Sequence, residues 1–88
     1  MKRTVEMVES RFLLGAHVKE LRIEQELTQG QLALIVGLDR SYISRVERGR
    51  CNVTLDAIML LAHGLGVTPS DLLASVGASG EAREVAGV

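Results

Sequence analysis

The sequence predicts an all-α protein, a compact bundle of five short helices. Hydrophobic residues make up 47% of the 88 positions but aromatic residues only 2%, which indicates an aliphatic core packed between helices. Five stretches combine apolar residues at helical spacing with a capping residue in front, and three of them end at a glycine. The length fits one domain, and a core this small gains from oligomerisation.

The first predicted helix begins behind Ser10 as N-cap and ends near Glu26. Its apolar stripe has spacings of four and three residues: Leu14, Val18 and Leu21. Gly15 costs about 1 kcal/mol relative to alanine in a helix interior, unless another helix crosses closely there. Residues 1–9 carry mixed charge and no clear cap. We assign them to an N-terminal arm, with an early turn of this helix as the alternative.

Two short helices with a tight corner between them fit the centre of the chain. Thr28 is the N-cap of the first, and Gly37 ends it because glycine adopts a left-handed backbone without a Cβ clash. Asp39 caps the second helix, which Gly49 closes. The residues that face inward at helical spacing are Leu32, Ala33, Val36, Ile43 and Val46.

Two further helices follow. Thr54 caps the fourth helix and Gly66 stops it, with one apolar face made of Leu55, Ile58, Leu61, Ala62 and Leu65. Thr68 caps a short fifth helix, with Pro69 at its first position and Asp71 in an acidic variant of the capping box. Val67, Leu72 and Leu73 anchor that helix. We therefore place one domain at residues 10–76 and a flexible tail at residues 77–88, where glycine, small and charged residues dominate.

Hydrogen-bonding side chains remain for the outside of the helix behind Asp39: Arg40, Ser41, Tyr42, Ser44, Arg45 and Arg48. A DNA major groove about 12 Å wide admits one α-helix, and its base edges and phosphates suit such donors. The stretch from Asp39 to Arg50 contains four arginines and two acidic residues, a net charge of +2. The whole chain has a net charge of −1, so the remaining residues sum to −3. Affinity for DNA depends on cations placed at phosphates rather than on the sum.

This central stretch resembles the helix-turn-helix of the Cro/repressor, or XRE-like, family of bacterial and phage regulators, from about Ser10 to Leu73. The matching positions are Thr28, Gln29, Ala33, Gly37, Ile43, Val46, Glu47, Arg48 and Gly49. The resemblance implies a lambda-repressor-like fold in which the second and third helices form the helix-turn-helix. It also implies that Gln29 holds a DNA phosphate and that Arg22 forms a structural ion pair with Glu47.

The outer face divides by position into base contacts and backbone contacts. Arg40 and Ser41 in the first turn, with Arg45 one turn further, are the candidates for base edges, since arginine matches the O6 and N7 of guanine. The candidates for the DNA backbone are Gln29, Tyr42, Ser44, Arg48, Arg50 and Asn52. Tyr42 alternatively touches a thymine methyl or packs at the helix edge.

Apolar side chains left on the outside point to partners. Leu60, Leu73 and Val76 form a predicted two-fold dimer surface, although single surface leucines are also common. A dimer would place two recognition helices about 34 Å apart on a roughly palindromic operator. Leu34 and Ile35 stand where relatives are usually polar, which fits either a partner contact or burial against the N-terminal arm.

Residues for catalysis or metal binding do not assemble into a site. Cys51 is the only cysteine, and His17 and His63 lack ligands at suitable spacing, so we expect surface histidines, no metal, no cofactor and no enzyme. No apolar run is long enough to span a membrane and residues 1–3 do not begin a secretory signal, so we expect a cytoplasmic protein.

The sequence therefore predicts a homodimeric transcriptional regulator that binds double-stranded DNA. Asp39 to Ser44 followed by Glu47-Arg48 further resembles restriction–modification controller proteins, and phage repressors share most of this pattern. RNA polymerase is a possible partner of such a regulator. The alternative is an antitoxin that sequesters a toxin through Leu34 and Ile35 or the tail, with DNA binding secondary.

Overall fold

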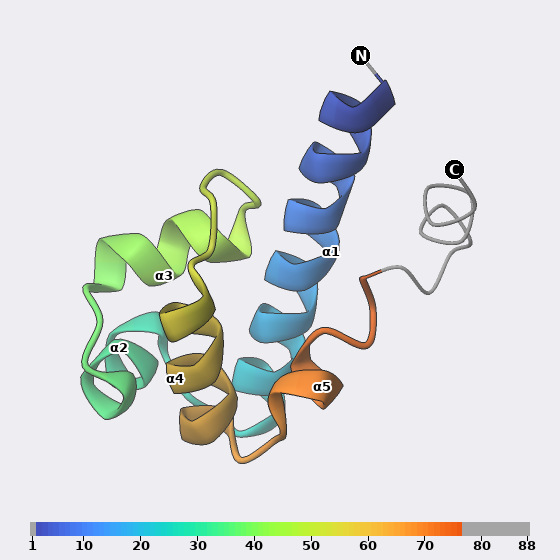
Figure 1. The fold of residues 1–88 in the computed structure, drawn as a ribbon. Coiled ribbons are helices and arrows are strands. Elements are labelled where there is room, and N and C mark those ends of the chain that lie inside the picture. Colours follow the sequence, from blue (N-terminus) through green and yellow to red (C-terminus); the bar gives the residue numbers. More distant parts are fainter. Residues whose placement is uncertain (1, 77–88) are drawn as a thin grey trace.

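The protein is a bundle of five helices without strands in the part of the chain described here (Figure 1). The computed structural model describes the backbone of residues 2–76 and the side chains of residues 9–76. The helices are α1 (Lys2–Glu24), α2 (Gln29–Val36), α3 (Arg40–Glu47), α4 (Leu55–Leu65) and α5 (Pro69–Leu72). The all-α prediction is confirmed. The tail predicted at residues 77–88 lies outside the described residues.

The start of α1 differs from the prediction. The helix begins at Lys2, so Ser10 lies inside it and is not its N-cap, and the alternative of early helical turns is the correct one for residues 2–9. The helix ends at Glu24, two residues before the predicted end. Glu26 takes a positive φ of 57° in the turn that follows, which reverses the chain toward α2.

The predicted N-cap residues precede all four remaining helices, and three of them cap through their side chains. Thr28 and Gln31 form a reciprocal capping box on α2, and Thr68 and Asp71 form another on α5. Thr54 accepts a hydrogen bond from the N–H of Ala57 at 3.1 Å. Asp39 is the N-cap residue of α3, as predicted, and is extended, but its side chain makes no capping hydrogen bond.

Left-handed glycines end the helices where the sequence indicates. Gly37 after α2 and Gly66 after α4 both have φ of 73°, and Gly49 has φ of 70° one residue beyond Arg48, the C-cap of α3. A side chain at these positions would be strained by the backbone conformation alone. The corner between α2 and α3 is therefore fixed by local chemistry.

The core lies where the five helices meet and is entirely aliphatic. Its buried residues are Leu14, Val18, Leu32, Ala33, Val36, Ile43, Val46, Leu61, Ala62, Leu65 and Leu72. Leu55, which we predicted on the inner face of α4, is 71% exposed, and Ala57 is buried in its place. Leu55 is the first residue of α4 and lies at the edge of the buried face. Ala57 shares its side of the helix with Leu61 and Leu65.

Two close crossings depend on glycine. A Cβ on Gly15 of α1 would lie 2.2 Å from the carbonyl oxygen of Val46, so α3 rests on α1 as the sequence analysis anticipated. A Cβ on Gly64 would lie 2.3 Å from Cγ1 of Val36, where α2 packs on α4. Gly30 has no such role, since the nearest atom to a Cβ there is 3.8 Å away.

Helices long and apolar enough to cross a bilayer are absent from the described part of the chain.

Candidate nucleic-acid interface

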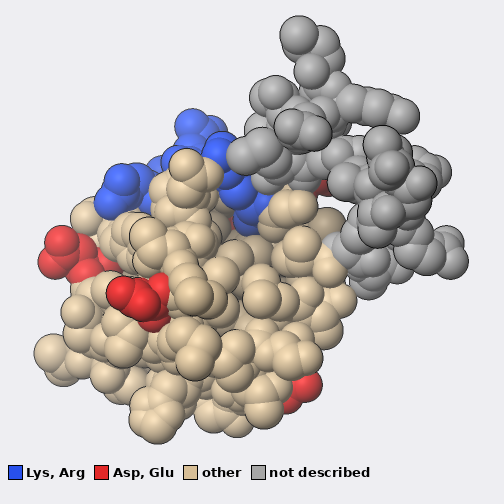
Figure 2. Space-filling model, viewed as in Figure 1, with Lys and Arg blue, Asp and Glu red and all other residues tan. Residues whose placement is uncertain are grey.

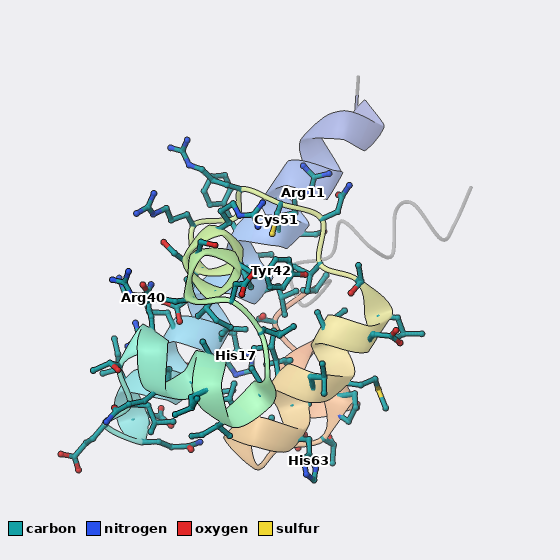
Figure 3. The ribbon with its side chains drawn as sticks, turned by 90° about the vertical axis from the view of Figure 1, so that its left-hand side faces the viewer. Arg11, His17, Arg40, Tyr42, Cys51 and His63 are labelled. Atoms are coloured by element: carbon teal, nitrogen blue, oxygen red, sulfur yellow. The ribbon has the colours of Figure 1, made fainter. Side chains whose placement is uncertain are left out.

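The outer face of α3 is polar, open and cationic. Ile43 and Val46 are fully buried beneath it, with exposures of 0% and 1%, and this fixes which side of the helix looks outward. Arg40, Ser41 and Arg45 are exposed, and Arg40 extends away from the body of the protein at the start of α3 (Figure 3). No carboxylate of the described residues pairs with these arginines. Their charges are therefore available to a ligand.

Arg45 is partly positioned before any ligand arrives. Its Cζ lies 5.6 Å from the centroid of the Tyr42 ring, a cation–π distance. Its Nε donates a long hydrogen bond of 3.5 Å to the carbonyl oxygen of Ser41. Such contacts reduce the side-chain entropy that Arg45 loses on binding.

Tyr42 does not occupy the position predicted for it. Its ring packs against the core, and its hydroxyl is buried without a hydrogen-bond partner among the described residues. A buried hydroxyl cannot reach a phosphate, so the assignment of Tyr42 as a DNA backbone contact is wrong. The alternative of packing at the helix edge is correct, and Tyr42 instead supports Arg45.

The remaining cations continue beyond the end of α3. Lys and Arg side chains gather along the upper edge of the molecule in Figure 2, the edge that carries α3 and the loop after it in Figure 1. Arg48 and Arg50 in this loop are exposed, and Ser44 is half-buried on α3. The N–H of Arg50 donates to the carbonyl oxygen of Arg45 at 2.9 Å, which ties the loop to the helix. The interface thus covers α3 and its C-terminal loop.

Arg11 of α1 joins this edge, although the sequence analysis did not single it out. Its Nη2 donates to Oδ1 of Asn52. The contact is possible because Gly49 lies against Phe12, where a Cβ would sit 2.9 Å from the ring. The two partners are 41 residues apart in sequence, and no local pattern connects them.

Glu47 is the anchor of α3, and the predicted ion pair is present. Its carboxylate accepts from Arg22 Nε at 2.7 Å and from Arg22 Nη2 at 2.9 Å. Arg22 also donates to the carbonyl oxygen of Leu27 at 2.7 Å. The hydrogen bonds to Glu47 raise the pKa of Arg22, and its buried position opposes them less strongly. The Arg22 guanidinium therefore stays charged, and the ion pair joins α1 to the end of α3.

Gln29 makes a third contact with the same carboxylate. Its Nε2 donates to Oε1 of Glu47 at 3.0 Å. A side-chain amide has two N–H donors, so one remains for a phosphate, as does the backbone N–H at the start of α2. The predicted role of Gln29 at the DNA backbone is compatible with this arrangement.

The histidines and the cysteine form no site. His17 is half-buried, and its Nδ1 lies 3.0 Å from the carbonyl oxygen of Leu72, so it joins α1 to α5 and is not the free surface residue that we predicted. His63 is exposed as predicted. Cys51 is a free, half-buried thiol in the loop after α3. The described residues contain no group of side chains able to hold a metal ion.

Two apolar surfaces lie away from the cationic edge. Leu60 on α4 is 42% exposed and Leu73, the C-cap of α5, is 36% exposed, with half-buried Val76 packed beside the core. On α2, Leu34 is 85% exposed and Ile35 is 56% exposed. The alternative in which this α2 pair is buried against the N-terminal arm is therefore wrong.

Fold and site together define a class: a small α-helical protein that presents one polar, cationic helix behind a glycine corner, as DNA-binding regulators do. The Helix-turn-helix family model matches residues 18–72, which contain all of α2, α3 and α4. The chain belongs to the helix-turn-helix family of DNA-binding regulators, a family without enzymatic activity, and the resemblance found in the sequence is confirmed.

Restriction–modification controllers are prominent among its relatives. The control protein C.BamHI of Bacillus amyloliquefaciens is 44% identical over 64 residues, covering 72% of this chain and 79% of that protein. The control protein C.SmaI of Serratia marcescens is 41% identical and covers 78% of this chain and 82% of that protein. The crystal structure of the controller protein C.AhdI from Aeromonas hydrophila superposes with a TM-score of 0.69 at 44% identity, covering 70% of this chain and 94% of that one.

Proposed function

We propose that this helix-turn-helix regulator acts as a homodimer on a roughly palindromic operator and that it controls genes in the manner of a restriction–modification controller. The observation that carries the DNA contact is the outward face of α3, where Arg40, Ser41 and Arg45 are exposed above a buried Ile43 and Val46. Control of operator DNA places the protein in the cytoplasm.

The residues of α3 would enter the major groove from the helix N-terminus. Arg40, Ser41 and Arg45 would face base edges, and a guanidinium favours guanine because its paired donors match O6 and N7. Each half-site should therefore contain at least one G·C pair. The phosphates of the DNA backbone would be held by Gln29, Ser44, Arg48, Arg50 and Asn52. These phosphate contacts fix the register of α3 without reading sequence.

Selection of binding sites from a pool of randomised DNA duplexes tests this proposal. We expect enrichment of two inverted half-sites whose centres lie about one helical turn apart, roughly 34 Å or 10 base pairs. The affinity for the selected duplex should fall steeply as salt concentration rises. A pool that shows no enrichment after repeated rounds would contradict sequence-specific binding, and a single unrepeated site would contradict the dimer.

Support for the dimer comes from apolar side chains that α4 and α5 leave exposed. Leu60 and Leu73 lie on these consecutive helices, with Val76 beyond them, and Met59 adds to the same outer side of α4 at 50% exposure. A surface of this kind suits a two-fold contact in which the same patch meets itself. It lies on helices other than α3, so dimerisation leaves the DNA-binding face free.

Sedimentation analysis of two matched variants tests the dimer. Leu60→Glu places a charge in the proposed contact and should give a monomer with weak operator affinity. Leu34→Glu changes an exposed leucine of α2 by the same substitution and should leave the dimer intact. The dimer surface is misplaced if Leu34→Glu separates the subunits and Leu60→Glu does not.

The controller role rests on similarity to proteins with that name, two at 44% and 41% identity. A reporter gene placed behind the DNA that precedes this coding sequence would test it. We expect reporter output to change with protein concentration and to become insensitive in Leu60→Glu, because a monomer cannot occupy both half-sites of the operator at once. If reporter output does not depend on the protein, an antitoxin becomes the better description. Co-purification of a toxin with the native protein, but not with variants of Leu34 and Ile35, would support that outcome. Recovery of RNA polymerase by the same α2 pair would instead support an activator.

A further inference from the structure

Arg11 carries a positive charge at the edge of the interface that no carboxylate of the described residues neutralises. Its described partner is the neutral amide of Asn52, and the one ion pair of the described residues joins Arg22 to Glu47. Arg11 is half-buried, so its position is restricted by the protein around it. A cation held in this way, next to a loop that contains Arg48 and Arg50, is suited to an anion from outside the protein.

The packing of α1 explains why Arg11 reaches the loop. Gly15 admits the carbonyl of Val46, and Gly49 lies against Phe12, so the helix turn that contains Arg11 and Phe12 runs beside the end of α3. Each contact leaves no room for a Cβ, and together they restrict movement of α1 relative to the loop. The close contacts at Gly15 and Gly49 therefore fix the position of the Arg11 backbone beside the loop.

The hydrogen bond also sets the orientation of Asn52. The guanidinium has donors only, so the amide must turn its oxygen toward Arg11 and its NH₂ group away. Asn52 is exposed, and its NH₂ therefore projects as a donor into solvent beside the remaining N–H groups of Arg11. Two donor groups, one of them charged, lie together on this edge.

We propose that Arg11 and Asn52 together bind one phosphate of the DNA backbone at the flank of α3. In this site Arg11 supplies the charge and orients the amide, and Asn52 supplies a neutral donor. A phosphate is the appropriate ligand because it offers acceptor oxygens and negative charge, whereas bases are reached from the first turns of α3. This inference rests on the proposed DNA-binding function and adds a residue of α1 to it.

The salt dependence of operator binding tests the site. Arg11→Gln removes the charge but keeps an amide that can donate to Asn52, so the fold should be retained, as the thermal unfolding midpoint will show. One lost phosphate contact should reduce the slope of log K against log salt by about 0.9 for each bound protomer. The affinity deficit per protomer should be about eightfold at 0.1 M salt relative to 1 M salt, because it follows the same power of the salt concentration.

Matched variants separate a contact from a general charge effect. Lys19→Gln removes an equal charge from an exposed position on the same helix, eight residues further from the loop, and should leave the slope unchanged. Arg11→Lys should restore most of the slope. If one phosphate is shared, Arg11→Gln should cost less in an Asn52→Ala protein than in the native one.

Each outcome has a distinct meaning. An unchanged slope in Arg11→Gln, an equal change in Lys19→Gln, or full additivity with Asn52→Ala would overturn the shared phosphate site while leaving DNA binding intact. Native protein without salt-dependent affinity for any duplex would instead overturn the proposed function itself.

Discussion

The two ends of α3 differ in how the protein holds them. At the C-terminal end, Glu47 accepts three hydrogen bonds from two other helices, and Val46 rests on Gly15 with no space between the backbones. At the N-terminal end, Asp39 makes no side-chain cap, and Arg40 and Ser41 are exposed. The difference shows that the helix is fixed from behind its last turn, so its first turns remain free of contacts that a ligand would have to displace.

The largest effect on stability should come from removing Glu47, which holds the C-terminal end of α3. Glu47→Ala leaves the buried Arg22 guanidinium without its carboxylate, and removing one partner of a buried pair costs about 3–5 kcal/mol in the free energy of unfolding. Chemical denaturation measures this loss. Glu24→Ala, at an exposed position on α1, serves as the control and should change stability little. A small effect of Glu47→Ala would show that α3 is held by apolar packing alone.

A smaller loss of stability should follow from adding a side chain where α1 and α3 cross, at Gly15. Gly15→Ala places a Cβ 2.2 Å from the carbonyl oxygen of Val46, and overpacking of this kind costs about 1–3 kcal/mol, partly offset by the better helix propensity of alanine. Gly30→Ala in α2 meets no atom closer than 3.8 Å and should not destabilise the fold. Thermal unfolding of the two variants compares them directly. Equal effects at both positions would mean that α1 and α3 can separate without cost.

The exposed arginines at the two ends of α3, Arg40 and Arg48, should respond in DNA affinity rather than in stability. Arg40→Ala should reduce the preference for one base pair of each half-site by about 1–3 kcal/mol, because a base contact is lost. Arg48→Ala should weaken all duplexes alike and lower the salt slope, because a phosphate contact is lost. Titrations with operator and single-substituted duplexes distinguish the two patterns. Identical patterns would remove our distinction between base and backbone contacts.

The smallest effect should come from Tyr42, which lies between the two ends. Tyr42→Phe removes a buried hydroxyl that lacks a partner among the described residues and keeps the ring under Arg45. Because an unsatisfied buried hydroxyl contributes nothing favourable, stability should stay within about 1 kcal/mol or rise slightly. Operator affinity should not change, and a loss measured by the same titration would return Tyr42 to the group of phosphate contacts.

The sequence predicts well what local chemistry decides. Thr28, Thr54 and Thr68 cap helices because a hydroxyl can satisfy the N–H groups of its own next turn, and Gly37 and Gly66 end helices because they alone tolerate the backbone. Helical spacing likewise identifies the buried side of α2 and α3. These features involve residues within one or two turns of one another.

The contacts that the sequence did not predict involve distance along the chain. Arg11 meets Asn52 across 41 residues and Gln29 meets Glu47 across 18, and neither pairing leaves a periodic signal. The inward turn of Tyr42 and the outward turn of Leu55 depend on which neighbour fills the remaining space in the core. The Arg22–Glu47 pair, also long-range, was anticipated only because related proteins share it.

The short segment of α1 from Gly15 to His17 connects two surfaces. Gly15 receives the backbone of α3, and two residues later His17 reaches the carbonyl of Leu72 in α5, beside the proposed dimer contact. Two residues span only about 3 Å of helix. In a dimer formed through α5, this segment of α1, which is less than one helical turn long, would therefore fix the position of each α3 relative to the dimer contact. Operators with an added base pair between the half-sites should then bind more weakly, because Gly15 and His17 join α3 and α5 to the same short part of α1.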